Sequence, residues 1–474
     1  MTLPRIIQGG MGAAVSNWRL ANAVSLRGQL GVVSGTGLDT VFVRRLQDGD
    51  SGGDLRRAME HFPLPEVAHD ALRRYFLPEG RAGAPYKDLP IYRLGASAAR
   101  ERLTMLACFV EVFLAREGHD GPIGINLLTK IQLPTLASLY GAMLAGVDVV
   151  LMGAGIPREI PTALDALAEH RTASLRLEVE GETSDRTEVM RLDPSAHLPA
   201  PSPALRRPLF LAIIASSLLA NVLVKKASGR VDGFVIEGPT AGGHNAPPRG
   251  EKTFNERGEP LYGPRDVVDL DKVKPLGLPF WLAGGFGRPG RLAEALEAGA
   301  AGIQVGTLFA FCDESGFTAE IKSSVLSHAA RGKVDVFTDP LASPTGFPFK
   351  TVRWAADPAI GIERHRVCDL GYLRIAYRTP TGELGYRCPS EPVEHYQDKG
   401  GSLAETEGRS CLCNALMASV GHGQVRAHGV VEQPLVTTGD DLLHMADLLV
   451  GRTHYSAADV IDYLLADEAS DSPG

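Results

Sequence analysis

The feature that most constrains the fold of this chain is a regular alternation of short apolar segments with Ala- and Leu-rich helical stretches. Eight segments have the composition of buried strands: residues 5–7, 30–33, 123–126, 147–151, 210–215, 233–236, 280–283 and 302–305. Helical windows follow several of them, at residues 18–26, 133–145, 217–226 and 291–298. Repeated strand–helix units predict a parallel sheet that helices cover on both faces.

The number of strands favours an α/β fold of the closed (β/α)₈ type, a TIM barrel. An open, doubly wound sheet is the alternative, but eight strands and 474 residues suit a large barrel with an appendage better. In such a barrel the chemistry is expected in the loops that follow the strands.

Two stretches interrupt the alternation, and a third follows it. Residues 49–93 predict a helical insertion, and residues 171–205 predict a hairpin insertion followed by a Pro-rich return to the barrel. We therefore expect the barrel to span residues 1–350. Residues 351–474, with four cysteines and two helical windows, are expected to form a C-terminal extension packed on it.

Charge and composition exclude several classes of partner. The formal net charge is −8, which argues against bulk binding to nucleic acid or to an anionic membrane, because both need a basic face. No apolar run approaches the roughly 20 residues that span a bilayer. The first residues lack the apolar core of a signal peptide, so we expect a cytoplasmic protein with reduced thiols.

Glycine-rich joints follow four of the predicted strands. Gly9 and Gly10 with Met11, and later Gly242 and Gly243, release the backbone at strand ends, where either a tight turn or a closely approaching ligand requires it. The joints after the last two strands contain Gly284 and Gly285, and Gly306 and Thr307. Loops at these two places often bind phosphate in TIM barrels, so a phosphate-bearing cofactor is expected here.

Two polar side chains stand at such joints. Asn126 ends a predicted strand and is either a ligand contact or a turn residue. His244 follows the glycine pair directly and is a candidate acid–base group, with a solvated or helix-capping histidine as the alternative.

Five short sequences, IIQGGMG, GIN, EGPTAGGH, LAGGFG and GIQVGTLFA, occur in this order along the chain. With them the chain resembles the nitronate monooxygenase family (formerly 2-nitropropane dioxygenases), which are FMN-containing TIM barrels. The resemblance covers roughly residues 1–350. Flavin-dependent enoyl-acyl-carrier-protein reductases, and the enoyl reductase components of polyunsaturated fatty acid and polyketide synthases, share the same pattern.

The resemblance implies FMN and a set of residues that contact it. His244 falls on the family's active-site histidine. The implied cofactor contacts are the isoalloxazine-binding residues Gln8, Gly9, Gly10 and Met11, the polar contact Asn126, the close-approach residues Gly242 and Gly243, and Gly284, Gly285, Gln304, Gly306 and Thr307 around the phosphate.

Three functions are compatible with this resemblance. The first is a nitronate monooxygenase that oxidises nitronates or nitroalkanes with O₂. The second is an enoyl-thioester reductase that uses NAD(P)H and acts with an acyl carrier protein of a fatty acid or polyketide synthase. The third is a non-catalytic flavin-binding component of a biosynthetic complex. Both insertions and the long extension depart from the compact nitronate enzymes, and a homo-oligomer is compatible with any of the three.

The extension concentrates four of the six cysteines: Cys368, Cys388, Cys411 and Cys413. Four thiolates are able to bind Zn²⁺ or an iron–sulfur cluster. The spacing lacks the usual CxxC pairs, and free cysteines are commonly small buried apolar residues. A metal centre and a buried thiol cluster are therefore both open at this point.

Overall fold

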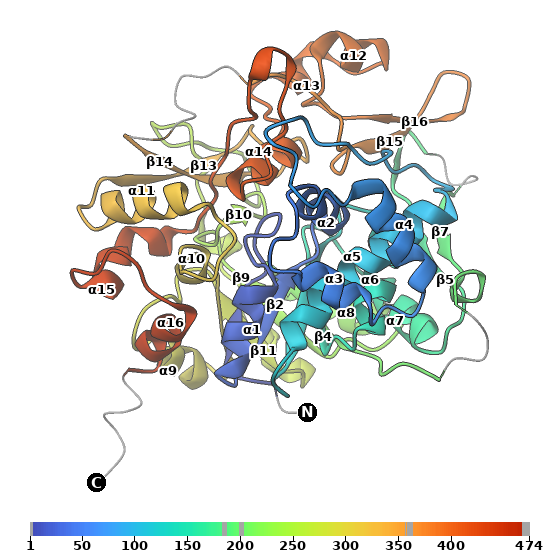
Figure 1. Cartoon of the computed structure of the whole chain (residues 1–474). Coiled ribbons are helices and arrows are strands. Elements are labelled where there is room, and N and C mark those ends of the chain that lie inside the picture. The colour runs from blue at the N-terminus through green and yellow to red at the C-terminus, as the bar shows by residue number, and fades with distance from the viewer. Residues whose placement is uncertain (1–2, 183–186, 199–202, 356, 358–363, 467–474) are drawn as a thin grey trace.

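A closed barrel of eight parallel strands lies at the centre of the computed structural model, which describes residues 3–182, 187–198, 203–355, 357 and 364–466 (Figure 1). The strands are β1 (Ile6–Gln8), β2 (Gly31–Ser34), β3 (Ile123–Leu128), β4 (Val149–Gly153), β8 (Leu209–Ile214), β9 (Gly233–Glu237), β11 (Phe280–Ala283) and β12 (Gly302–Val305). Their order in the sheet is β1-β12-β11-β9-β8-β4-β3-β2. A parallel bridge between Ile7 and Leu30 joins the two ends of this order, with Gln8 N–H donating to Leu30 O at 2.9 Å.

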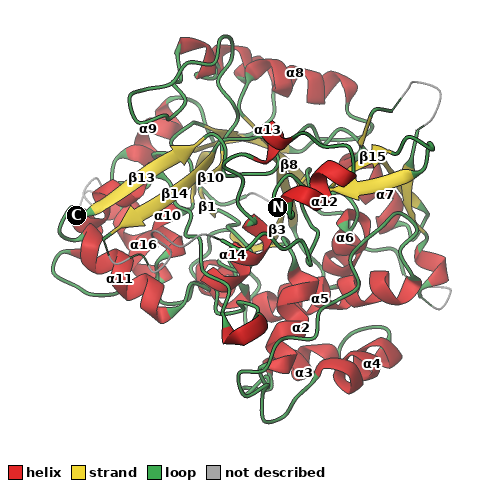
Figure 2. Ribbon diagram, turned by 90° about the horizontal axis from the view of Figure 1, so that it is seen from above, coloured by secondary structure: helices red, strands yellow, loops and turns green. Residues whose placement is uncertain are grey.

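All eight predicted strands are present, and the prediction of a TIM barrel is confirmed. Helices cover the outside of the barrel, as Figure 2 shows from above. Those that follow the strands are α1 (Trp18–Leu26), α5 (Ala98–Arg116), α6 (Thr135–Leu144), α7 (Ile160–Ala168), α8 (Ser217–Lys226), α9 (Arg291–Glu297), α10 (Thr307–Ala310) and α11 (Ala319–Ala329). Within the described ranges, none of the helices has both the length and the apolar character needed to cross a membrane.

Apolar side chains fill the inside of the barrel. Val32, Val149, Leu211 and Val235 point inward from four strands and are fully buried. Trp281 closes one end of this core and donates its indole N–H to the carbonyl of Pro4 at 3.0 Å. The interior is therefore a packed core, and any ligand must bind at the rim of the barrel.

Both predicted insertions form the expected kinds of structure. The helical insertion contains α3 (Asp54–Met59) and α4 (Pro65–Tyr75), and α2 (Leu38–Gln47) precedes it. The hairpin insertion pairs β5 (Ala173–Arg176) with β7 (Val189–Leu192) in antiparallel register. Residues 183–186, at the predicted polar tip of this hairpin, lie outside the described residues.

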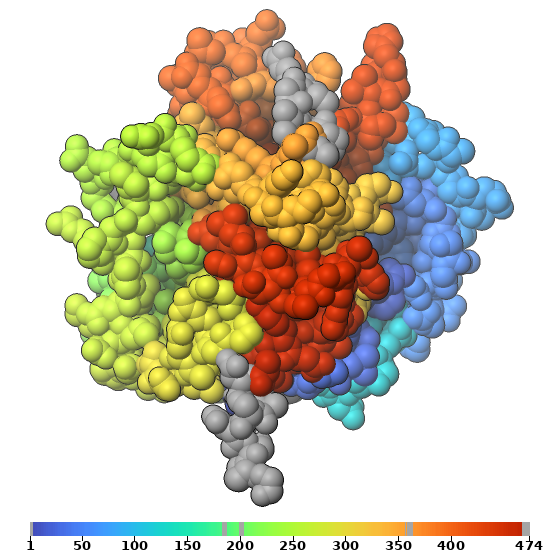
Figure 3. All heavy atoms as spheres, turned by 90° about the vertical axis from the view of Figure 1, so that its left-hand side faces the viewer, coloured from blue at the N-terminus to red at the C-terminus, as the bar shows by residue number. Residues whose placement is uncertain are grey.

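The C-terminal extension packs on the barrel in two places. Its strands β15 (Ile375–Arg378) and β16 (Leu384–Arg387) join β6 (Val179–Glu180) of the hairpin insertion. Figure 3 shows the last, red part of the chain lying over the yellow segment that carries α9 to α11, and α16 also contacts α1. Its helices are α12 (Val393–Asp398), α13 (Leu403–Thr406), α14 (Leu412–Ser419), α15 (Met445–Leu449) and α16 (Ala457–Leu464).

Not all of the extension was expected. The first of the two helical windows became α14, whereas the second became a 3₁₀ helix (Asp440–His444) followed by α15. The strands β13 (Val334–Asp339) and β14 (Phe349–Trp354) form an antiparallel hairpin across the predicted boundary at residue 350. Shorter 3₁₀ helices occupy Pro194–Ala196, Pro264–Asp266, Leu270–Lys272, Lys274–Leu276 and Ala427–Gly429.

A hydrogen bond to a buried ion pair of the barrel helices ties the extension to the barrel. Arg100 on α5 contacts Asp39 on α2 at 2.6 Å, and both side chains are almost fully buried. Tyr372 of the extension donates its hydroxyl to the same carboxylate. Burial alone would raise the pKa of Asp39, but the Arg100 guanidinium and the Tyr372 hydroxyl hold the pKa below its usual value.

Removing one partner of this ion pair should lower the stability of the folded protein. We expect Arg100→Met to lower the free energy of unfolding by about 3–5 kcal/mol, because it leaves the Asp39 carboxylate buried without its cation. Chemical denaturation measures this. The matched control is Arg73→Met, which removes an exposed ion pair with Asp70 and should cost no more than about 1 kcal/mol. Equal losses in the two variants would contradict the anchoring role of the buried pair.

Candidate active site

One cavity opens where the barrel strands end and the extension covers them. It contains about 1500 Å³ of space, including its open mouth. The predicted site residues that line it are Gly9, Gly10, Met11, Asn126, Gly242, Gly243, His244, Gly284, Gln304, Gly306 and Thr307. Gln8 and Gly285 were predicted with them but do not line it. The structure thus brings together eleven of the thirteen predicted residues from five separate joints.

The first joint forms one wall of the cavity. Asn126 donates its side-chain N–H to the carbonyl of Gly10 at 3.0 Å. A Cβ atom on Gly10 would lie 2.3 Å from the Cβ of Asn126, so this position requires glycine. Gln8 lies behind the wall and is fully buried: it accepts from Val32 N–H at 3.0 Å and donates to Ser16 Oγ at 2.8 Å. The side chain of Gln8 therefore supports the joint from the barrel side.

The adjoining part of the wall contains the joints after β11 and β12, since β12 pairs with β1. Gln304 lies beside Gly9, and its Oε1 atom is buried without a hydrogen-bond partner among the described residues. Asn126 Oδ1 is also buried without a hydrogen-bond partner among the described residues. Because buried acceptors without a partner are uncommon in native proteins, these two oxygens indicate a ligand with hydrogen-bond donors.

A segment of the extension completes this wall, which the sequence did not predict. Thr437, Thr438, Gly439 and Asp441 line the cavity beside the predicted glycines. Gly439 N–H donates to Thr307 Oγ1 at 2.9 Å, and Gly243 N–H donates to Thr437 Oγ1 at 2.9 Å. The residues after the barrel thus supply part of the site as well as a cover for it.

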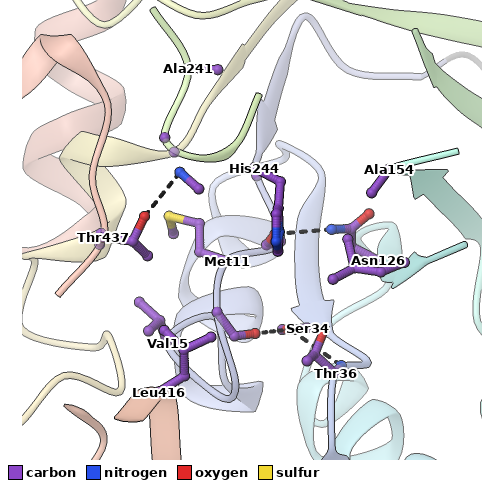
Figure 4. A pocket seen from close by; sticks show the side chains of 18 of the residues that line it. Met11, Val15, Ser34, Thr36, Asn126, Ala154, Ala241, His244, Leu416 and Thr437 are labelled. Carbon is purple, nitrogen blue, oxygen red and sulfur yellow. Dashed lines mark hydrogen bonds between the residues drawn. The ribbon is translucent and has the colours of Figure 1, made fainter. Parts of the chain in front are cut away.

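His244 is held from three sides. It lies on the two-residue strand β10 (Gly243–His244), which pairs with β14 so that His244 is opposite Phe349. The rings of these two residues make an edge-to-face contact with centroids 4.8 Å apart. His244 Nε2 is 2.7 Å from Ser343 Oγ. In the view of Figure 4 the imidazole lies between the side chains of Met11 and Asn126.

Burial favours the neutral form of two titratable groups here. It lowers the pKa of His244 to about 4, because an imidazolium would lose its hydration. It raises the pKa of Glu237 to about 7, because a carboxylate would lose its hydration. Burial also raises the pKa of Asp441, although the N–H of Gly287 donates to its carboxylate at 3.2 Å. None of the described residues that line the cavity is Lys or Arg.

A large part of the cavity lining is apolar. Leu373, Leu412, Leu416 and Met417 of the extension line it together with Leu128, Ile131, Ile213 and Phe349. We call this surface the apolar roof. It gives the cavity a polar wall with two unpaired oxygens and an apolar wall, which is the usual composition of a small-molecule site.

The prediction of a metal centre at the four cysteines is not supported. Cys368, Cys388, Cys411 and Cys413 do line one small cavity next to the site. Yet across the described ranges no three His, Cys, Asp or Glu side chains are arranged to hold a metal ion. Cys411 instead donates its thiol to the carbonyl of Val367 at 3.3 Å, and burial raises its pKa to about 11, which favours a neutral thiol.

Comparison with known proteins identifies part of the chain. Residues 199–336 match the family model described as nitronate monooxygenase. The predicted family resemblance is confirmed over this segment, which runs from β8 into β13 and contains His244. Gly9, Gly10 and Asn126 lie outside the match, as does the whole extension. No curated protein matches the sequence.

Three solved structures are similar to the chain over nearly its whole length. A nitroalkane oxidase from Streptomyces ansochromogenes has 16% identity and a TM-score of 0.49, over 99% of this chain and 97% of its own. FabK from Thermotoga maritima has 16% identity and a TM-score of 0.47, over 98% and 93%. The enoyl reductase domain of MlnA from the macrolactin cluster of Bacillus amyloliquefaciens has 11% identity and a TM-score of 0.44, over 98% and 94%. Similarities this distant support no statement about activity.

The raised pKa of Glu237 has a consequence for stability. Glu237 binds its proton more tightly in the folded state than in the unfolded state. Its protonated form therefore stabilises the folded state below pH 4.5, and this stabilisation is lost as the pH rises towards 7. We expect Glu237→Gln to remove this loss, so that the melting temperature of the variant falls less than that of the wild type between pH 4.5 and 7. His244 contributes the opposite slope in both proteins, so the comparison isolates Glu237. If the melting temperatures of the variant and the wild type change with pH in the same way, the raised pKa of Glu237 is contradicted.

Proposed function

We propose that this chain is an FMN-dependent oxidoreductase that oxidises nitronates or nitroalkanes with O₂. The observation that carries the proposal is the position of His244, which lies within the family segment and lines a cavity with two unpaired buried oxygens. A monooxygenase is an oxidoreductase, so the family match supports the general class directly. The cofactor and the substrate are the finer part of the proposal.

The residues of the cavity suit FMN. Its flat ring system needs a wall without side chains, and Gly9, Gly10, Gly242 and Gly243 supply one. Asn126 Oδ1 and Gln304 Oε1 are acceptors without partners and would receive hydrogen bonds from the ring. Backbone N–H groups at the joints after β11 and β12 would hold the phosphate. The bound flavin would accept electrons from the substrate, and O₂ would complete the oxidation.

His244 would act on the substrate carbon. Its low pKa leaves the imidazole unprotonated at neutral pH, so it enters the reaction as a proton acceptor. It would remove the α-proton of a nitroalkane, whose electron pair moves to the nitro group and gives a nitronate. The negative charge that develops on the substrate would offset the cost of the buried imidazolium.

The apolar roof favours a second candidate, an enoyl-thioester reductase. Leu373, Leu412 and Leu416 add apolar surface beyond what a small nitroalkane would cover, and an acyl chain would bury it. In that reaction NAD(P)H would be the reductant and an acyl carrier protein the partner. A non-catalytic flavin-binding component is the third candidate.

Anaerobic stopped-flow mixing separates these candidates. For the proposed monooxygenase, a nitronate should bleach the flavin absorbance and NAD(P)H should not. Bleaching by NAD(P)H but not by nitronate would replace the proposal with the reductase. Bleaching by neither would favour the non-catalytic component, and a protein that cannot be loaded with FMN would refute all three.

The extension's contribution to the cofactor site can be tested at Gly439. A Cβ atom there would lie 2.9 Å from both the Thr240 carbonyl oxygen and Thr307 Oγ1. We expect Gly439→Ala to displace this wall and raise the Kd of FMN at least about tenfold, measured by flavin fluorescence. The control is Gly263→Ala, where a Cβ atom meets no atom within 4 Å. Unchanged FMN binding by Gly439→Ala would remove the extension from the cofactor site.

The role of His244 can be tested with two forms of one substrate. We expect His244→Ala to retain FMN and to lose turnover of the neutral nitroalkane by about 10²–10⁴-fold, the usual contribution of a general base. Turnover of the preformed nitronate should fall much less, because that substrate has already lost its proton. Equal losses with both forms would exclude His244 as the base.

A further inference from the structure

The loop between β13 and β14 places two hydroxyl groups in a row behind His244. Ser343 Oγ is 2.7 Å from His244 Nε2 and 2.8 Å from Thr345 Oγ1. Ser343 is fully buried, whereas Thr345 is half-buried. Arg409 donates to the carbonyls of Leu341 and Ser343 at 2.7 and 2.6 Å, which fixes the backbone of the loop. The residues of this loop lie outside the family segment.

The hydrogen bonds of Ser343 allow two arrangements. The backbone N–H of Thr345 donates to Ser343 Oγ at 3.2 Å and occupies one of its lone pairs. One lone pair and one hydroxyl proton remain for two neighbours, His244 Nε2 and Thr345 Oγ1. Ser343 must therefore accept from one of them and donate to the other.

The two arrangements put the imidazole proton on different nitrogens. If Ser343 donates to Nε2, the neutral ring carries its proton on Nδ1. If Ser343 donates to Thr345, it accepts from a protonated Nε2, and Nδ1 is left with a lone pair. In the first case His244 offers a proton to a ligand in the cavity, and in the second it receives one.

The proposed role of His244 as a base requires the second arrangement. His244 Nδ1 has no hydrogen-bond partner among the described residues but is not one of their buried unpaired atoms, so it is open to the cavity that His244 lines. In the second arrangement this open nitrogen carries the lone pair and can accept a proton from a ligand in the cavity. The half-buried Thr345 can then donate its own hydroxyl in a hydrogen bond to water.

We propose that Ser343 and Thr345 are positioning residues that hold the proton of His244 on Nε2 and leave Nδ1 as the acceptor for the substrate proton. The α-proton of the substrate moves to Nδ1, and the C–H electron pair stays on the substrate. The proposal rests on the proposed role of His244 as the base, but the position of the ring proton can be measured without turnover.

Thr345→Val tests this most directly. Valine keeps the shape of threonine but offers Ser343 no acceptor, so Ser343 turns its proton to Nε2 and the ring proton moves to Nδ1. ¹⁵N NMR of histidine-labelled full-length protein at pH 7 reports which nitrogen is protonated, and His244→Gln assigns the signals. We expect protonated Nε2 in the wild type and protonated Nδ1 in Thr345→Val.

Kinetics give the second readout. Thr345→Val should lower kcat for a neutral nitroalkane at least about tenfold and leave the rate with preformed nitronate unchanged. Thr345→Ser restores the acceptor and should restore both the protonation pattern and the rate. A wild-type ring protonated on Nδ1, or a Thr345→Val ring still protonated on Nε2, would overturn the proposal. If neither substrate form is turned over by the wild type, the proposed function fails while the NMR result still decides the role of the hydroxyl pair.

Discussion

The site depends on the pairing of a two-residue strand, β10, with β14. Gly243 and His244 leave the barrel after β9 and would have no regular partner without it. Lys350 and Phe349 supply the register, and Thr437 adds a side-chain acceptor for the N–H of Gly243. The Thr437 hydroxyl in turn donates to the carbonyl of Lys350 at 2.6 Å, so three separate parts of the chain meet in one hydrogen-bonded unit. The histidine is therefore oriented by residues that follow the barrel.

This arrangement also determines the electrostatics of the cavity. The glycine joints and the apolar roof desolvate the titratable groups between them, and none of the described residues that line the cavity is Lys or Arg. The same desolvation lowers the pKa of His244 and raises that of Glu237, so both groups tend towards neutrality near pH 7. The two unpaired oxygens favour ligands that bring hydrogen-bond donors, and the apolar roof favours ligands that bring apolar surface. Any charge that develops on a ligand during a reaction in this cavity must therefore be stabilised by nearby dipoles.

The barrel and much of the site were predictable, because both follow from local patterns. Each barrel strand is a short apolar run, and glycines occur in four of the joints that follow, so Gly10, Gly243 and Gly306 could be located without a structure. The contributions of Ser343 and Thr437 could not. They belong to loops whose polar residues resemble those of any surface turn, and only tertiary packing brings them to His244 and Gly243. For the four cysteines, sequence proximity indicated a cluster but not the direction of each thiol, which decides between a metal centre and separate buried groups.

The division between the family segment and the rest of the chain bears on how function is inferred. Residues 199–336 bring the imidazole to the cavity, but the hydroxyl pair that contacts its far nitrogen comes from residues 343 and 345. Proton abstraction from a nitroalkane and proton donation to an enoyl product need the same ring in the same place. In our proposal the two reactions differ in which ring nitrogen of His244 carries the proton. The direction in which the Ser343 hydroxyl donates determines this. In our proposal the difference between the two reactions therefore lies in the loop between β13 and β14, outside the family segment.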